Sequence, residues 1–362
     1  MQSSLRLPAA ARILAAIAIF AVTACADPPA DDRSARVDAL FARFQGGVQP
    51  GVAVLVVADG EVLHERTYGY ADLAAERRLA PSSRFRLASV SKQFTTMAVM
   101  MLAEDGTLGY DDRLAEWLPD LAAYEGVTIR HLMQHTAGLP DYYDTVADDA
   151  ERLSNADVER LLAKLSAPVF APGSRYEYSN SAYEMLANIV ERASGMGFAE
   201  FMRERIFEPL GMHGTLVHDH RWPTVDERVL GYSPTDDGYA LDDGSPLNGI
   251  IGSGSMYAPL ADFRHWDRAL RENLLVSRAT LEQAWTPAVT TDGASTGYGY
   301  GWDVGEHAGH RRVAHGGSWV GFRTHIAHFP DNGLTIVVLA NRSDVAPGEF
   351  VDALSEIYLP GP

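Results

Sequence analysis

The sequence predicts an α+β fold, in which one antiparallel sheet of about five strands is built from both chain ends and covered by helices. Two observations lead to this expectation. Strand-like segments are confined to residues 52–70 and 298–341, and helical runs with long loops fill about 110–295. The composition, 46% hydrophobic and 22% charged, is that of a globular protein. The middle of the chain is therefore expected to form an inserted, mainly helical lobe.

The first 25 residues read as an export signal that is not part of the fold. Two arginines precede an apolar run at 13–22, which is too short for a bilayer span of about 20 residues but fits a secretory signal. The run ends in Val-Thr-Ala-Cys25, which resembles a bacterial lipobox, and Cys25 is the only cysteine. We expect an exported, periplasmic protein whose membrane contact is a lipid anchor at Cys25. The alternative is ordinary cleavage near Ala24 or Ala26.

The N-terminal elements follow in order. Residues 26–34 read as a polar tether, and 38–44 have apolar residues at helical spacing. Residues 52–58 and 61–70, rich in β-branched side chains and separated by Asp-Gly, predict a β-hairpin. An apolar helix is expected at 89–104.

The middle of the chain has no convincing alternating strand, and its helices are expected at 155–165, 181–193, 198–207 and 260–272. Strands return at 298–304, 311–315, 321–329 and 334–341, before a closing helix at 346–358. We therefore expect one catalytic domain over 35–362, with an α/β lobe (about 35–108 and 296–362) and a helical lobe (about 109–295). A cleft is expected where the lobes meet.

The charge balance bears on partners and on chemistry. Acidic residues outnumber basic ones by 48 to 30, net −18, which argues against a nucleic-acid partner. Only Lys92 and Lys164 are lysines. An amine that can lose its proton therefore has two candidates, because arginine stays charged.

The first chemical motif is Ser89-Val90-Ser91-Lys92. At the start of a helix, positions i and i+3 share a face, so the Ser89 hydroxyl and the Lys92 amine are expected side by side. Serine needs a neighbouring base, and an amine whose pKa falls can serve. By itself the pattern also fits a capping serine with a surface lysine.

The second motif is Tyr178-Ser179-Asn180, before the helix at 181–193. A phenol near an ammonium can act as acid and base in one cycle if its pKa is lowered. Asn180 can donate to a substrate carbonyl while it accepts from the lysine. The alternative is that Asn180 is a plain helix cap.

The third motif is His315-Gly316-Gly317-Ser318, at the end of a strand. Glycines in a strand let another backbone approach closely. The bared edge could pair with a peptide-like substrate, and the Ser318 N–H could stabilise an oxyanion. The alternative is a glycine turn with a partly exposed histidine.

In this order and spacing, the three motifs resemble the serine β-lactamase and penicillin-binding protein superfamily. The tyrosine motif points to its branch of class C β-lactamases, carboxylesterases, D-aminopeptidases and D-alanyl-D-alanine carboxypeptidases. The resemblance covers about residues 36 to 358 and includes the flanks 85–94 (FRLASVSKQF) and 131–140 (HLMQHTAGLP). It implies a β-lactamase/transpeptidase-like fold, in agreement with the strand pattern.

The resemblance also implies roles for these residues. Ser89 would be the acylated nucleophile, and Lys92 and Tyr178 would share proton transfer, with Tyr178 serving the leaving group and the deacylating water. Asn180 would position substrate, together with the strand at His315 and Gly317. The N–H groups of Ser89 and Ser318 would form the oxyanion hole. No metal or organic cofactor is implied.

One departure bears on the substrate. Many β-lactamases have Lys-Thr-Gly where this chain has His315-Gly316-Gly317, and a histidine is a weaker cation for a penicillin carboxylate. We therefore expect a serine hydrolase for D-amino-acid peptides, of the D-alanyl-D-alanine carboxypeptidase type, or for small esters. The partner is a small-molecule or peptide substrate, with cell-wall peptide as one candidate. The alternatives are a class C-type β-lactamase and a slow penicillin-binding or sensor protein.

Overall fold

The computed structural model describes residues 30–146, 152–165, 167–219 and 224–361. The predicted signal segment and Cys25 lie outside the described residues. Among the described residues, none of the helices has the length and apolar character needed to cross a membrane.

The main sheet has six antiparallel strands in the order β10-β11-β12-β13-β1-β2. Its members are β1 Val52–Ala58, β2 Glu61–Tyr68, β10 Asp303–His307, β11 His310–Trp319, β12 Phe322–Phe329 and β13 Leu334–Ala340. The α+β class and the sheet from both chain ends are confirmed, with one strand more than the five expected. The two chain ends join where β1 pairs with β13, from Val52 opposite Ala340 to Ala58 opposite Leu334.

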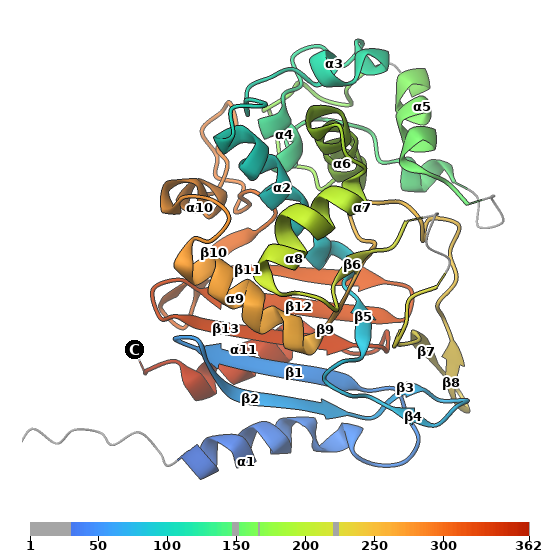
Figure 1. Cartoon of the computed structure of the whole chain (residues 1–362), viewed down its shortest axis with the longest axis vertical. Helices are drawn as coiled ribbons and strands as arrows, with labels where there is room; N and C mark the ends of the chain where they lie inside the picture. The colour runs from blue at the N-terminus through green and yellow to red at the C-terminus, as the bar shows by residue number, and fades with distance from the viewer. Residues whose placement is uncertain (1–29, 147–151, 166, 220–223, 362) are drawn as a thin grey trace, which may run out of the picture.

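Helices cover both faces of this sheet (Figure 1). Helices α1 (Ala30–Phe41) and α11 (Pro347–Tyr358) pack on one face, and α2 (Lys92–Glu104) and α9 (Phe263–Glu272) on the other. Strand β1 explains why both faces must be covered. Its side chains alternate between the two apolar cores, with Val52, Val54 and Val56 in one and Ala53, Leu55 and Val57 in the other. Helix α1 begins at Ala30, inside the segment expected as a tether.

The helices of the inserted lobe include those expected at 155–165, 181–193 and 198–207. They are α3 Leu114–Trp117, α4 Ile129–Met133, α5 Asn155–Leu165, α6 Asn180–Ser194, α7 Phe198–Phe201, α8 Glu208–Leu210 and α10 Arg278–Ala284. Helix α5 has the predicted bounds. Helix α9, from the same stretch of sequence, lies against the main sheet (Figure 1).

The expectation of no strand between 110 and 295 is wrong. Strand β9 (Met256–Pro259) pairs with β5 (Arg84–Arg86) and with β6 (Leu216–Val217). Strands β7 (Tyr232–Thr235) and β8 (Gly238–Leu241) form a hairpin. All four residues of β9 are buried, so the strand has no alternating pattern for a sequence to display. A further short pair, β3 (Tyr70–Asp72) and β4 (Arg77–Arg78), follows β2.

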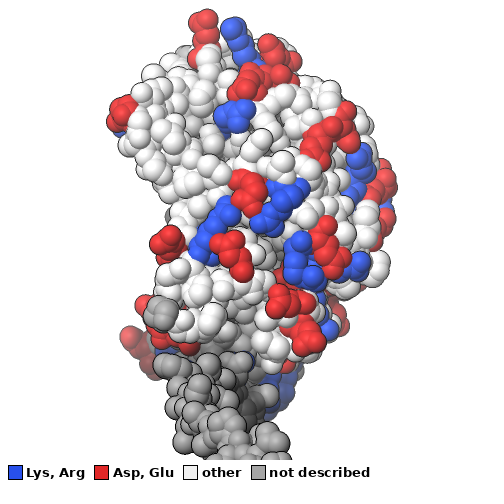
Figure 2. Space-filling view, turned by 90° about the vertical axis from the view of Figure 1, so that its left-hand side faces the viewer, with Lys and Arg blue, Asp and Glu red and all other residues white. Residues whose placement is uncertain are grey.

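One face of the molecule carries mixed charge despite the acidic composition. On the face shown in Figure 2, acidic and basic side chains are interleaved, and no broad patch of one sign is seen. This face offers no basic surface of the kind that binds a phosphate backbone.

Candidate active site

Ser89 and Lys92 lie on one continuous helical segment. A 3₁₀ turn, Ala88–Ser91, runs directly into α2, which begins at Lys92. The Lys92 side chain is fully buried, and its Nζ donates to Ser89 Oγ at 3.1 Å, Asn180 Oδ1 at 2.8 Å and the Ser253 carbonyl oxygen at 3.0 Å. The structure thus brings together the first two motifs, with Asn180 at the N-terminus of α6.

Burial lowers the pKa of Lys92. Removal from water lowers the pKa of the amine from 10.5 to about 7, against the opposing charges of Glu184 and Asp141. A substantial fraction of Lys92 is therefore neutral at neutral pH. At 3.1 Å the neutral amine can accept the proton of the Ser89 hydroxyl.

Tyr178 completes the group but differs from the expectation in one respect. Its ring centroid lies 4.7 Å from Lys92 Nζ, and Tyr178 and Ser89 line the same groove. Burial raises the pKa of the phenol above its ordinary value, whereas the sequence argument required it to fall. The phenol is therefore protonated in the free protein, which suits it to donate a proton rather than to accept one first.

Strand β11 passes close to Ser89, and Gly317 makes this approach possible. A Cβ on Gly317 would collide with the Leu87 carbonyl oxygen and with Thr324 Oγ1, two groups that are themselves hydrogen-bonded at 2.7 Å. The glycines of β11 were expected to let another backbone approach closely. The backbone that approaches Gly317 is that of Leu87, two residues before Ser89. The next residue, Ser318, lines both cavities that Ser89 lines.

His315 is buried and uncharged. Its Nδ1 lies 2.7 Å from the Gly316 carbonyl oxygen, and its Nε2 lies 2.9 Å from the Tyr298 hydroxyl. Burial, with Lys92 nearby, lowers the pKa of His315 to about 3. At neutral pH the ring is therefore no cation for a substrate carboxylate, and its two nitrogens are engaged within the protein.

Two residues that the sequence reasoning did not single out support these groups. The His135 ring packs 4.2 Å from that of Tyr178, and its Nδ1 accepts from the Ser179 N–H at 3.1 Å. Glu184 is fully buried, and its Oε1 accepts from Tyr142 at 2.7 Å and from the Ser253 hydroxyl at 2.9 Å. Burial raises the pKa of Glu184 to about 8. The sequence held a clue to each of them: His135 lies within the flanking stretch 131–140, and Glu184 lies one helical turn after Asn180.

Two cavities meet at Ser89. A cavity of about 150 Å³ is also lined by Asn180, Tyr143, Trp319 and Arg86. A groove of about 620 Å³ lies along β11 and includes Tyr178, His315 and Arg323. Ser89 can therefore be reached from two sides, and only the groove is lined by Tyr178. In the described part of the chain, no group of three histidine, cysteine or acidic side chains is arranged to hold a metal ion.

Comparison with known proteins identifies relatives of this chain. The family model described as Beta-lactamase matches residues 37–357. The chain is 35% identical over 307 residues to "Penicillin-binding protein 4*" of Bacillus subtilis, covering 80% of this chain and 68% of that protein. It is 34% identical over 320 residues to a D-aminopeptidase of Cereibacter sphaeroides, covering 84% of this chain and 59% of that enzyme. The chain thus spans about three fifths of the D-aminopeptidase.

Solved structures share the fold. The penicillin-binding protein from Bacillus halodurans aligns with a TM-score of 0.75 at 26% identity, over 89% of this chain and 98% of that chain. D-amino acid amidase from Ochrobactrum anthropi aligns with a TM-score of 0.76 at 23% identity, over 90% and 98% respectively. The β-lactamase/transpeptidase-like fold expected from the motifs is therefore confirmed.

The glycine pair in β11 provides a matched test of the oxyanion geometry. Gly317→Ala should lower kcat for 4-nitrophenyl acetate about a hundredfold or more, because displacing β11 misplaces the Ser318 N–H. Gly316→Ala should keep kcat near that of the unaltered protein, since its Cβ would meet nothing nearer than His325 Nδ1 at 3.4 Å. Both variants are compared after circular dichroism has shown equal folding. Equal kcat values for the two folded variants would contradict the expected role of the Ser318 N–H in the oxyanion hole.

Proposed function

The chain belongs to the β-lactamase family, and we propose that it is a serine hydrolase that cleaves amide or ester bonds through an acyl-enzyme on Ser89. The observation that carries the proposal is the buried Lys92 amine, 3.1 Å from Ser89 Oγ and with a pKa lowered to about 7. Serine is activated when a base of suitable pKa lies within hydrogen-bond reach.

Acylation uses Lys92 as the base and Tyr178 as the acid. Neutral Lys92 takes the proton of Ser89 as Oγ attacks the substrate carbonyl, and the N–H groups of Ser89 and Ser318 stabilise the oxyanion. Tyr178 gives its proton to the departing amine or alcohol as the carbonyl–heteroatom bond breaks. The Lys92 ammonium then returns a proton to the phenolate, which leaves Lys92 neutral again. Asn180 keeps the amine aligned and offers its N–H₂ to the substrate.

Deacylation repeats these steps with water in place of the leaving group. Water transfers a proton to Lys92 by way of Tyr178 and attacks the acyl carbonyl. The Ser89 oxygen leaves and recovers a proton from Lys92. Each proton accepted in one half of the cycle is thus returned in the same half, and no cofactor takes part in these steps.

Peptides of D-amino acids are the substrate class that we favour, with small esters next. The relatives include a penicillin-binding protein and a D-aminopeptidase. Arg323 lines the groove beside Tyr178 and can meet the carboxylate of a departing C-terminal residue, as in a cell-wall peptide. A β-lactam substrate and a slowly deacylating penicillin sensor remain the alternatives, and they are less favoured because His315 is uncharged.

We further propose that the chain is exported to the periplasm and held at a membrane by a lipid on Cys25. The support is the sequence of residues 1–25. The intact mass of the membrane-bound protein should equal that of the chain from Cys25 onward plus a lipid. The Cys25→Ser variant should be found in the soluble periplasmic fraction. A mature N-terminus at any other residue would contradict the anchor.

The nucleophile is tested by two serine variants. Ser89→Ala should lower hydrolysis of N-acetyl-D-Ala-D-Ala and of 4-nitrophenyl acetate by at least about a thousandfold, because the activated oxygen is gone. Ser82→Ala, an exposed serine seven residues earlier, should leave both rates unchanged. Mass spectrometry with benzylpenicillin should detect an adduct on the unaltered protein and none on Ser89→Ala. Hydrolysis that persists in Ser89→Ala would disprove the proposal.

The pH dependence tests the role of Lys92. Because only the neutral amine is a base, kcat/KM for an uncharged ester should rise about tenfold per pH unit below 7 and level off above it. Lys92→Arg should abolish the activity at every pH, since a guanidinium keeps its proton. Lys164→Arg, the exposed second lysine, is the control and should keep the profile. A flat profile between pH 5 and 9 would rule out Lys92 as the base.

A further inference from the structure

Arg86, the last residue of β5, is a buried cation at the small cavity beside Ser89. Its side chain is 3% exposed, and it makes one hydrogen bond, from Nη2 to the Asn248 carbonyl oxygen at 3.3 Å. Its Nε and Nη1 are buried without an acceptor, and no described carboxylate forms an ion pair with it. Burying a charge with so few partners is costly, so an anion in the adjoining cavity would be attracted to this guanidinium.

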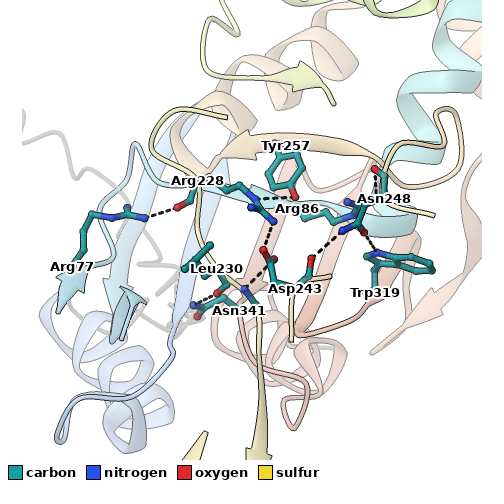
Figure 3. Close-up of polar contacts among 10 residues, drawn as sticks. Arg77, Arg86, Arg228, Leu230, Asp243, Asn248, Tyr257, Trp319 and Asn341 are labelled. Carbon is teal, nitrogen blue, oxygen red and sulfur yellow. Dashed lines mark hydrogen bonds and ion pairs between the residues drawn. The ribbon is translucent and has the colours of Figure 1, made fainter. Parts of the chain in front are cut away.

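The surroundings hold Arg86 in place without neutralising it (Figure 3). Asp243, the carboxylate whose field reaches Arg86, is already ion-paired with Arg228, which also donates to the Tyr257 hydroxyl. Asp243 is therefore the ion-pair partner of Arg228, which leaves Arg86 with no such partner among the described residues. The guanidinium carbon of Arg86 lies 5.6 Å from the Trp319 ring centroid and 5.8 Å from that of Tyr257, so flat apolar surfaces limit its movement.

Asn248 links Arg86 to the cavity wall. Its carbonyl oxygen accepts from Arg86, and its side-chain oxygen accepts from Trp319 Nε1 at 2.7 Å. Its amide nitrogen donates to the Asp243 carbonyl oxygen at 2.9 Å. Cation and indole are thus fixed by the same residue on the same side of Ser89, which is the arrangement of a preorganised binding site.

The position of Tyr178 decides which part of a substrate enters this cavity. The leaving group must depart toward its proton donor, and Tyr178 lines the groove along β11 but not the small cavity. The acyl portion therefore points into the small cavity. A volume of about 150 Å³ suits a group of roughly benzene's size.

We propose that the small cavity binds a carboxylate carried on the acyl portion of the substrate, and that Arg86 is the residue that selects for it. The proposal rests on the proposed function, because it takes Ser89 as the acylated residue. It narrows the substrates to peptides or esters whose acyl part ends in a short carboxylate-bearing chain. It disfavours substrates with a free ammonium on the acyl residue, which would face the guanidinium.

The test compares two esters of equal shape, monomethyl glutarate and methyl 5-methylhexanoate. The unaltered protein should prefer the glutarate ester in kcat/KM by about tenfold to a hundredfold, the range of a charge-assisted hydrogen bond. Arg86→Met should reduce this ratio to near one. Arg84→Met, two residues earlier on β5 and outside the cavity lining, should leave the ratio unchanged. A ratio near one in the unaltered protein would overturn the proposal, while hydrolysis of both esters would still uphold the proposed function.

Binding and stability measurements keep the test independent of turnover. Calorimetry on Ser89→Ala should detect tighter binding of monomethyl glutarate than of the neutral ester, and the added Arg86→Met change should remove the difference. If no ester is turned over while this preference persists, the proposed function fails and the anion site stands. The melting temperature of Arg86→Met should equal or exceed that of the unaltered protein, because an apolar side chain replaces an unpaired buried charge. A large fall in melting temperature together with unchanged ester selectivity would show a structural role and overturn the proposal.

Discussion

The buried amine of Lys92 is the constraint on which the rest of the site depends. Its three acceptors come from three separate stretches of chain: the turn that holds Ser89, the start of α6 at Asn180, and the segment at Ser253. Water at this point would raise the pKa of the amine toward its usual value and remove the base. The helical lobe and the sheet must therefore stay closed on each other to keep the fully buried Lys92 amine away from water.

The parts of the fold that the sequence predicted are those with a local signal. Alternating or β-branched runs marked the sheet strands, and apolar spacing marked α5 with its observed bounds. The small sheet of β5, β6 and β9 was missed, because strands of two to four residues have no period of their own. Strand β9 pairs with β6 across about 40 residues and with β5 across more than 170, and such distant pairing leaves no local pattern in the sequence.

The site, like the fold, has some features that the sequence predicted and others that it did not. The Ser89–Lys92 contact follows from helical spacing, and the resemblance supplied Tyr178 and Asn180. The environment of each group did not follow, since burial by distant elements sets it. It leaves His315 uncharged and raises the pKa of Tyr178 where a fall was expected. Arg86 and His135 stood within flanks that the sequence analysis quoted, but nothing local distinguished them from ordinary structural residues.

The pairing of β1 with β13 has a consequence for biosynthesis. Strand β1 is made early, but it pairs with residues 334–340, which are made much later. The Gly51 N–H likewise donates to Asn341 Oδ1, which lies 290 residues further along the chain. Until then the ribosome-bound chain exposes one edge of a wholly apolar strand, which invites pairing with other chains. Contacts of such sequence separation also form slowly. The sheet cannot be completed before residues 334–340 have been made, so the yield of native protein depends on keeping β1 unpaired until that strand is available.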